Sequence, residues 1–248
     1  MTEIITEKPA TYSLRLSFYF WMTAIMAVLV FGGFGITYWQ PMATSSLAPL
    51  PPIVHIHGFL FSAWMLLLVT QSLLVNVRNV PLHRSLGTFG IAIATLVWIF
   101  ALMLTILPSD PTGQTTGFQY FSLEYLSISA VILFGVLFTL AIRNVRSPDN
   151  HRRYILFAII PLLPPGINRL YMALLDTFTL PLLWTYLTMD LLVAAIVIHD
   201  WRTRGALTSA SITGTVLIVG TQLLHVPITG SESFADFCMF LGSLSGYR

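Results

Sequence analysis

Charged residues are scarce in this sequence. They make up 9% of its 248 residues, whereas hydrophobic residues make up 56%. A soluble domain carries about 25% charged residues, so a surface this poor in charge excludes an ordinary water-soluble domain. We therefore predict an integral membrane protein, with the lipid bilayer as its main partner.

Cysteine and lysine are almost absent. Cys238 is the only cysteine, which excludes an intramolecular disulfide and any metal site built from several thiolates. Lys8 is the only lysine and precedes the first apolar run, so a Schiff-base cofactor such as retinal has no attachment point within the membrane. The sequence also contains no Walker loop, no GxGxxG before a helix, no Cys-x-x-Cys-His and no GxSxG motif, so these signals of nucleotide, haem and hydrolase chemistry are missing.

Long apolar runs dominate what is present. A helix needs about 20 residues to cross a bilayer, and seven runs reach that length: 14–39, 53–76, 86–108, 118–142, 153–175, 180–199 and 207–227. We predict an all-α fold, a polytopic membrane bundle of seven transmembrane helices that forms one domain over residues 14–227. Residues 1–13 precede this domain, and residues 228–248 follow it as a tail.

The basic residues predict the orientation of the bundle. Ten of the twelve Lys and Arg residues fall before or at the very start of the first run, or in the second, fourth and sixth gaps between runs, counting Arg153 at the first position of the fifth run with the fourth gap. Cytoplasmic loops are enriched in these residues, so segment 1–13 is expected in the cytoplasm and tail 228–248 outside. Because the basic residues border the spans and form no separate basic domain, no nucleic-acid partner is expected.

Prolines interrupt the fifth run. Pro161, Pro164, Pro165 and Gly166 predict a broken helix, and such breaks are tolerated where they line a cavity or are buried in protein. A half-helix beginning near Gly166 would direct its positive dipole end and Arg169 toward an anion or a carboxylate. In the alternative interpretation, Arg169 only pairs with an intramembrane acid and stabilises the kink.

Several ionisable residues lie inside or near the ends of the runs. Rise along a helix places them within roughly 3 to 15 Å of the expected outer surface: His57, Glu124, Arg169, Asp190 and His225. A charge at the centre of a membrane helix costs at least ~2.5–3.5 kcal/mol, so each is expected to face the bundle interior or a partner. Arg169 can pair with only one of the two acids, Glu124 and Asp190. The other acid must then be protonated, or paired with His57, or paired with a bound cation.

The second run carries a polar stripe. His57, Trp64 and Gln71 recur every seven residues and therefore lie on one helix face, which we predict to point inward. The alternative for His57 is a packing histidine bonded to a backbone carbonyl. Together with the intramembrane polar residues, the stripe gives a predicted ligand-binding set: His57, Trp64, Glu124, Asn168, Arg169 and Asp190.

Histidines leave a cofactor possible. His57 and His225 are the candidate ligands of a metal or of a haem iron, so haem or a divalent metal stays an open alternative. His83, His151 and His199 flank the cytoplasmic span ends, but none of the zinc-binding spacings is present. We interpret these cytoplasmic clusters, including Arg152 and Arg153, as contacts with lipid phosphates and water.

The string His55-Ile-His57-Gly58, with Trp64 and Gln71 after it, is followed by Leu82-His83-Arg84-x-Leu86-Gly87. This pattern resembles a group of uncharacterised bacterial seven-helix multi-pass membrane proteins, and Asp149-x-His151-Arg152-Arg153 and Asp200-x-Arg202-Thr-Arg204-Gly205 fit the same group. The resemblance covers roughly residues 50–225 and implies a bacterial cytoplasmic (inner) membrane protein, but no activity. Adiponectin-receptor and ceramidase relatives place a His-x3-His pair in the last span, which this chain lacks.

The sequence leads to three hypotheses of function. The first is a ligand-binding or transport protein with a polar pocket in the outer half of the bilayer, for a small anionic or carboxylate-bearing ligand, with proton coupling. The second is a membrane oxidoreductase that uses a metal or haem bound through His57. The third is a non-catalytic subunit of a larger membrane complex or a homo-oligomer. No catalytic residue is identified, and whether the protein is an enzyme stays open.

Overall fold

The computed structural model describes residues 16–106, 117–176 and 181–244, and every element in these ranges is a helix. The all-α fold predicted from the sequence is confirmed for this part of the chain. The elements are α1 (Phe18–Phe34), η1 (Gly35–Trp39), α2 (Gln40–Ala43), α3 (Pro52–Asn76), α4 (Val80–Ile106), α5 (Gly117–Arg143), α6 (Pro148–Ile159), η2 (Ile160–Leu162), α7 (Pro164–Leu175), α8 (Leu182–Arg204), α9 (Ser209–Thr229) and α10 (Glu232–Leu244).

The long helices have the length and composition of membrane spans. Six of them, counting α1 to α2 as one, are long and apolar enough to cross a bilayer. A further pair, α6 with η2 and then α7, passes the same test together but is bent by 49° at its break. Each run predicted from hydropathy overlaps one of these elements. The chain is thus a multi-pass helical bundle whose surface suits lipid.

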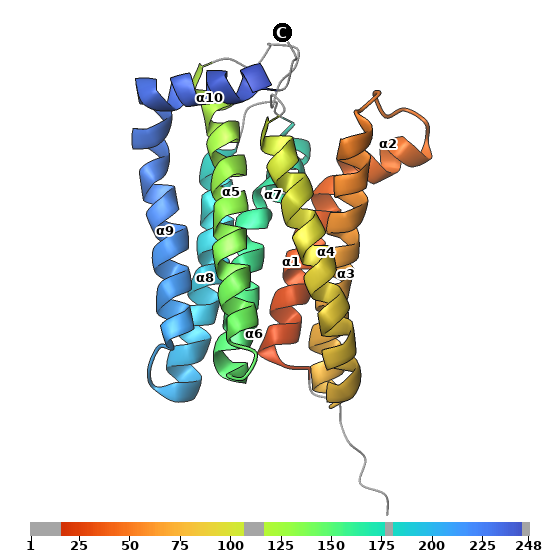
Figure 1. Cartoon of the computed structure of the whole chain (residues 1–248), viewed down its shortest axis with the longest axis vertical. Helices are drawn as coiled ribbons and strands as arrows, with labels where there is room; N and C mark the ends of the chain where they lie inside the picture. The colour runs from red at the N-terminus through yellow and green to blue at the C-terminus, as the bar shows by residue number, and fades with distance from the viewer. Residues whose placement is uncertain (1–15, 107–116, 177–180, 245–248) are drawn as a thin grey trace, which may run out of the picture.

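The helices alternate in direction, so the connections gather at two ends (Figure 1). The start of α1 and the α3–α4, α5–α6 and α8–α9 connections lie at the lower end in this view. Apart from Arg169, every arginine in the described ranges belongs to these termini or connections. We call this end the basic end. At the opposite end α10 lies across the bundle, packed on α4, α5 and α9.

Local sequence signals explain where the helices begin and end at the basic end. Ser17 caps α1 by accepting a hydrogen bond from the Phe20 backbone N–H, and Thr208 caps α9 through the N–H of Ser211. Gly205 ends α8 in the left-handed region, at φ 71°, where glycine has no Cβ to clash. The tight turn that follows brings the start of α9 back toward the last turns of α8.

The break after α6 is satisfied within the protein. Pro164 and Pro165 have no N–H to donate, and the chain makes a single 3-10 turn in which the Leu163 N–H donates to the Ile160 carbonyl. The N–H groups of Gly166 and Ile167 then donate to the Leu163 carbonyl. The half-helix terminus predicted near Gly166 therefore has these two N–H groups already bonded.

Two glycines let α1 and α7 touch backbone to backbone. A Cβ added at Gly33 would lie 2.0 Å from the Gly166 carbonyl oxygen, and one at Gly166 would lie 2.9 Å from the Val30 Cα. No larger residue fits at either position without a shift of a helix. This contact fixes the rotation of α7 about its axis, and it therefore decides which side chains of α7 face α1.

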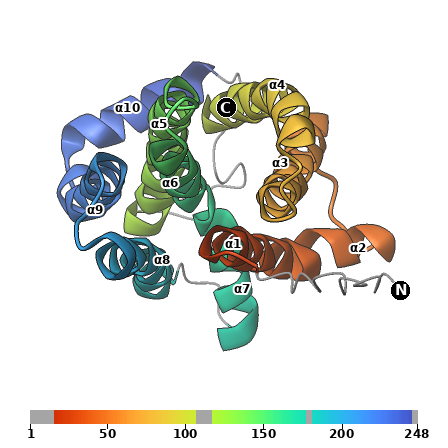
Figure 2. The same ribbon diagram turned by 90° about the horizontal axis from the view of Figure 1, so that it is seen from below.

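Helix α6 is the most enclosed of the helices at the basic end. Figure 2, which views the bundle from that end, shows α6 between α5 and α1, and it also packs on α9. Phe157 is fully buried against Gly214 of α9, where an added Cβ would lie 2.2 Å from the Phe157 ring. Arg153, one turn earlier on the same helix, is also fully buried.

Candidate functional site

A cavity of about 480 Å³ opens at the basic end. Three segments form it: the start of α1, the start of α6 and the last turns of α8. Most of its lining side chains are polar or charged, in contrast to the apolar faces of the same helices. The lining residues are Ser17, Phe18, Tyr19, Asp149, Arg152, Arg153, His199, Thr203 and Arg204. We call this cavity the arginine pocket.

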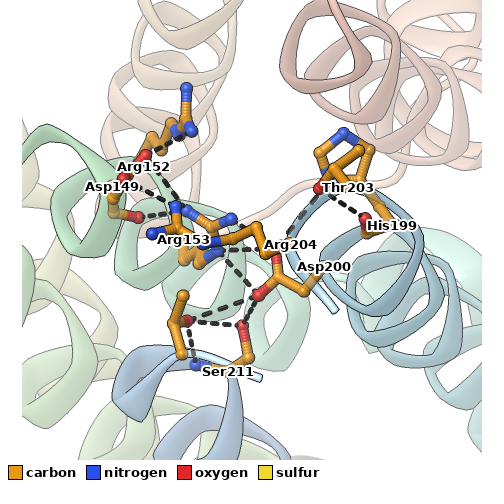
Figure 3. Close-up of polar contacts among 9 residues, drawn as sticks. Asp149, Arg152, Arg153, His199, Asp200, Thr203, Arg204 and Ser211 are labelled. Atoms are coloured by element: carbon orange, nitrogen blue, oxygen red, sulfur yellow. Dashed lines mark hydrogen bonds and ion pairs between the residues drawn. The ribbon is translucent and has the colours of Figure 1, made fainter. Parts of the chain in front are cut away.

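A buried ion pair forms the floor of the arginine pocket (Figure 3). The side chains of Arg153 and Asp200 are both 0% exposed. The Arg153 Nε lies 2.8 Å from each Asp200 carboxylate oxygen, and the Nη2 donates to Oδ1 as well. The remaining Nη1 donates to the Asp149 backbone carbonyl at 2.6 Å.

The start of α9 completes the coordination of Asp200. Its Oδ2 accepts hydrogen bonds from the hydroxyls of Ser211 and Thr208, which the turn at Gly205 brings into reach. A buried charge is tolerated when it is paired and its remaining lone pairs are bonded. The pair therefore joins α6, α8 and α9 at one point, and the Arg153 charge is held in a fixed position.

A second, half-exposed layer of charge lies above this floor. Asp149 gives one carboxylate oxygen to Arg152 and the other to Arg204, the latter at 2.6 Å. These three side chains are 40–43% exposed, and the Arg152 guanidinium lies 4.3 Å from the centre of the Tyr19 ring. Three arginines against two aspartates leave the arginine pocket with one net positive charge.

Two aromatic residues place unused polar atoms on the wall. The Tyr19 hydroxyl and the His199 Nδ1 are buried atoms without a hydrogen-bond partner. The His199 ring stacks on Phe18 with 4.0 Å between ring centres, and its Nδ1 lies 3.8 Å from Asp200 Oδ1. Buried polar atoms are normally bonded to protein or water, and the Tyr19 hydroxyl in particular lacks such a partner.

The polar stripe predicted on the second span lies on α3. Trp64 is 3% exposed and packs edge-on against Phe134 and Phe138 of α5, in line with an inward-facing stripe. His57 and Gln71 are half-buried. Each of the three carries a buried polar atom without a hydrogen-bond partner, namely His57 Nδ1, Trp64 Nε1 and Gln71 Oε1.

His225 takes part in a hydrogen-bond chain in the half of the bundle away from the basic end. One ring nitrogen is hydrogen-bonded to the Tyr186 hydroxyl on α8, and the other lies 2.9 Å from the Ser122 hydroxyl on α5.

Glu124, also on α5, is 4% exposed. In α10, outside the spans, burial and the nearby charge of Glu124 raise the pKa of the Cys238 thiol to about 11.

Asp190 lies one turn along α8 from Tyr186 and is half-buried, and its Oδ1 is a buried atom without a hydrogen-bond partner. A cavity of about 10 Å³, close to the size of one water, lies beside the proline break and is lined in part by Tyr186, Thr221 and Gln222. Asn168 is buried and accepts a hydrogen bond from Thr185 of α8.

Arg169 contacts α1 and its own helix. It is exposed, its guanidinium is 4.7 Å from the centre of the Phe34 ring of α1, and its Nη1 donates to the Pro165 carbonyl at 3.1 Å. No ion pair joins it to Glu124 or Asp190 among the residues the structure describes. The reason is the Gly33–Gly166 contact, which turns this face of α7 toward α1.

The histidines do not gather into a metal centre in the described ranges. No group of three or more His, Cys, Asp or Glu side chains there has the arrangement of a metal site. Both ring nitrogens of His225, one of the two predicted ligands, already lie within hydrogen-bond distance of hydroxyl groups. His57, the other predicted ligand, keeps a free Nδ1 on α3.

The arginine pocket was not among the features predicted from the sequence, although the sequence contains two local signals of it. Asp149 precedes Arg152 and Arg153 by three and four residues, and Asp200 precedes Arg204 by four, which are the spacings of facing side chains on a helix. The structure keeps the local pairing of Asp149 with Arg152 and adds pairs across helices, Arg153 with Asp200 and Arg204 with Asp149. Only the fold shows that they surround a cavity.

The fold and this site define a multi-pass helical membrane protein with a charged pocket at one end. Comparison with known protein families, curated proteins and solved structures finds no match. The function must therefore be inferred from the geometry of the site itself.

Replacement of Arg153 by methionine should strongly destabilise the protein, because the Asp200 charge would be left buried without its partner. Breaking a buried pair costs about 3–5 kcal/mol, which thermal unfolding in detergent would detect. Arg146→Met, at an exposed position of the same end, is the matched control. The double variant Arg153→Met/Asp200→Leu should lose less stability than the two single changes added together. An Arg153→Met protein as stable as Arg146→Met would contradict the structural role of the pair.

Proposed function

We propose that the chain crosses the membrane seven times, with its N-terminus in the cytoplasm and tail 228–248 outside. The bent pair of α6 with η2 and then α7 is then one broken span, which the internally bonded break supports. The concentration of arginines at the basic end supports a cytoplasmic location for that end. Resemblance to bacterial multi-pass proteins supports the inner membrane.

The function that the geometry favours is binding of a small anionic ligand in the arginine pocket. The observation that carries this proposal is a cavity of about 480 Å³ with three guanidinium groups on its wall. Guanidinium groups recognise carboxylates and phosphates through paired N–H donors. One of the three is locked by Asp200, whereas the other two share a single half-exposed carboxylate that an incoming anion can replace.

This places the anion site at the cytoplasmic end and not beside Arg169. The Gly166 and Ile167 N–H groups at the start of α7 already donate to Leu163, so they offer little to a ligand. The arginine pocket, in contrast, has a net positive charge and two unpartnered polar atoms. The sequence led us to expect a small anionic or carboxylate-bearing ligand; the proposed ligand is likewise a small anion, but its site is different.

Anion binding should raise the thermal stability of the purified protein. With inorganic phosphate or succinate at a hundredfold excess over its Kd, the melting temperature should rise by about 5 °C relative to chloride at equal ionic strength. Arg152→Gln and Arg204→Gln should each lose most of this shift in melting temperature, because each removes one of the two guanidinium groups proposed to bind the anion. Arg146→Gln, which removes a charge outside the pocket, should keep it. Equal shifts in all four proteins would rule out the pocket as the binding site.

A second candidate function, proton transfer through the other half of the bundle, is favoured by Asp190. Its buried Oδ1 has no hydrogen-bond partner, and one turn away Tyr186 begins a chain through His225 to Ser122. The water-sized cavity beside Tyr186 also suits a relay, because proton transfer over short gaps uses single waters. This proposal retains the proton coupling expected from the sequence without a role for Arg169.

Asp190→Asn should abolish such a relay. In proteoliposomes that contain a trapped pH-sensitive dye, the wild type should acidify faster than empty vesicles when a membrane potential is imposed. The Asp190→Asn protein should acidify at the rate of empty vesicles, whereas Asp176→Asn, at the end of α7, should behave as the wild type. A relay through Asp190 is refuted if the asparagine variant conducts protons as fast as the wild type.

A further inference from the structure

The half-exposed layer of the arginine pocket contains a carboxylate where a ligand is expected. Asp149 bridges Arg152 and Arg204 with one oxygen on each, and it belongs to the first turn of α6. Building on the proposed anion site, we propose that the pocket binds a phosphate group, and that Asp149 occupies the place of this group when no ligand is bound. Asp149 then acts as an internal competitor that sets the affinity.

The pocket offers hydrogen-bond donors on more than one side. The Asp149 carboxylate accepts from Arg152 and Arg204, and the Tyr19 hydroxyl on the same wall has no hydrogen-bond partner. A phosphate has more acceptor oxygens than a carboxylate, directed toward the corners of a tetrahedron. Its oxygens can therefore face both arginines and the Tyr19 hydroxyl at the same time.

The charges also fit a phosphate. With Asp149 displaced, Arg152, Arg153 and Arg204 face only the carboxylate of Asp200, which leaves two positive charges in the pocket. A phosphate monoester carries a charge of about −1.5 to −2 at neutral pH, and a diester carries a single negative charge. Binding of either group in place of Asp149 leaves less unbalanced charge in the pocket than the two positive charges alone.

The two layers differ in how easily they can rearrange. Arg153 is fully buried and bonded to Asp200 and to the Asp149 carbonyl. It therefore stays in place, and its positive charge attracts an anion in the pocket. The pairs of Asp149 with Arg152 and Arg204 are 40–43% exposed, and exposed ion pairs contribute little to stability. An incoming phosphate can therefore replace the Asp149 carboxylate while the contacts between Arg153 and Asp200 stay in place; of the buried arginine's contacts, only the longer one from Nη1 to Asp149 Oδ1, at 3.6 Å, is exchanged.

Two sources could supply the phosphate: a soluble phosphate ester or a lipid headgroup. The lining residues lie in the first turns of α1 and α6 and the last turns of α8, which is the depth of headgroups for a span in a bilayer. Basic pockets between helices at the cytoplasmic side suit anionic headgroups. Nearby outward-facing side chains are apolar and suit acyl chains: Trp21 is 54% exposed, Ile198 50% and Trp201 65%.

The test measures phosphate affinity with and without the internal carboxylate. Full-length protein in detergent is titrated calorimetrically with inorganic phosphate, and separately with succinate, at constant ionic strength. We expect Asp149→Asn to bind phosphate about tenfold more tightly than the wild type, because the competitor is gone. Asp149→Glu should restore weak binding, and Arg152→Gln and Arg204→Gln should bind at least about tenfold more weakly. The matched controls Asp176→Asn and Arg146→Gln should not change the affinity.

A second experiment, with lipids, identifies the source of the phosphate. Native mass spectrometry compares the protein in nanodiscs of phosphatidylglycerol and of phosphatidylcholine. Retention of phosphatidylglycerol that depends on Arg152 and Arg204 assigns the site to a headgroup. Phosphate titration without lipid retention assigns it to a soluble ester. Both results support the proposal.

Other outcomes overturn the proposal and separate it from the proposed function. If succinate binds through Arg152 and Arg204 but Asp149→Asn does not strengthen phosphate binding, the pocket is a carboxylate site and the role of Asp149 is wrong. Tighter binding of succinate than of phosphate by the wild type leads to the same conclusion. If neither anion binds to any of the folded variants, the anion site itself is wrong.

Discussion

The ion pair between Arg153 and Asp200 is the contact on which the basic end of this molecule depends. It lies fully buried where α6, α8 and α9 meet, and the two hydroxyls of Thr208 and Ser211 complete it. A charge in hydrocarbon is expensive unless it is paired, so neither partner can be exchanged alone. The pair fixes how α6 and α8 sit relative to each other, and these two helices form most of the wall of the arginine pocket.

The same constraint explains the rest of the charge distribution. Apart from Arg169, the described arginines that have no buried acid lie at the basic end. The break between α6 and α7 bonds its own backbone groups around Leu163, and the α1–α7 contact covers it. Among the described residues, buried polar atoms without a hydrogen-bond partner lie on the α3 stripe, at Asp190, on the wall of the arginine pocket, and at His83, Thr215 and Gln222. These are places where a ligand, an ion or water has something to bind.

Hydropathy and charge were sufficient to predict the helices and the clustering of the arginines. Each of the seven runs overlaps a long apolar helix or the bent pair of α6 with η2 and then α7, and the period of seven in α3 predicted that Trp64 points inward. The rotation of α7 was not predictable, because it depends on a contact between Gly33 and Gly166, far apart in sequence. With that contact in place, Arg169 lies against Phe34 of α1 and Asn168 bonds to Thr185 of α8. The two predicted site residues on α7 therefore lie on different faces of that helix. The arginine pocket was missed for a related reason: Arg153 and Asp200 are separated by 47 residues, and nothing local in the sequence indicates that they meet.

The central claim is that the arginine pocket opens to the cytoplasm and holds an anion. Thr203 lines the pocket and is exposed, so a Thr203→Cys protein with Cys238 replaced by serine offers one reactive thiol at the site. A membrane-impermeant maleimide should label it in inside-out vesicles and not in intact cells, and inorganic phosphate should slow the labelling. Labelling from the outer surface, or a rate that phosphate leaves unchanged, would contradict the account.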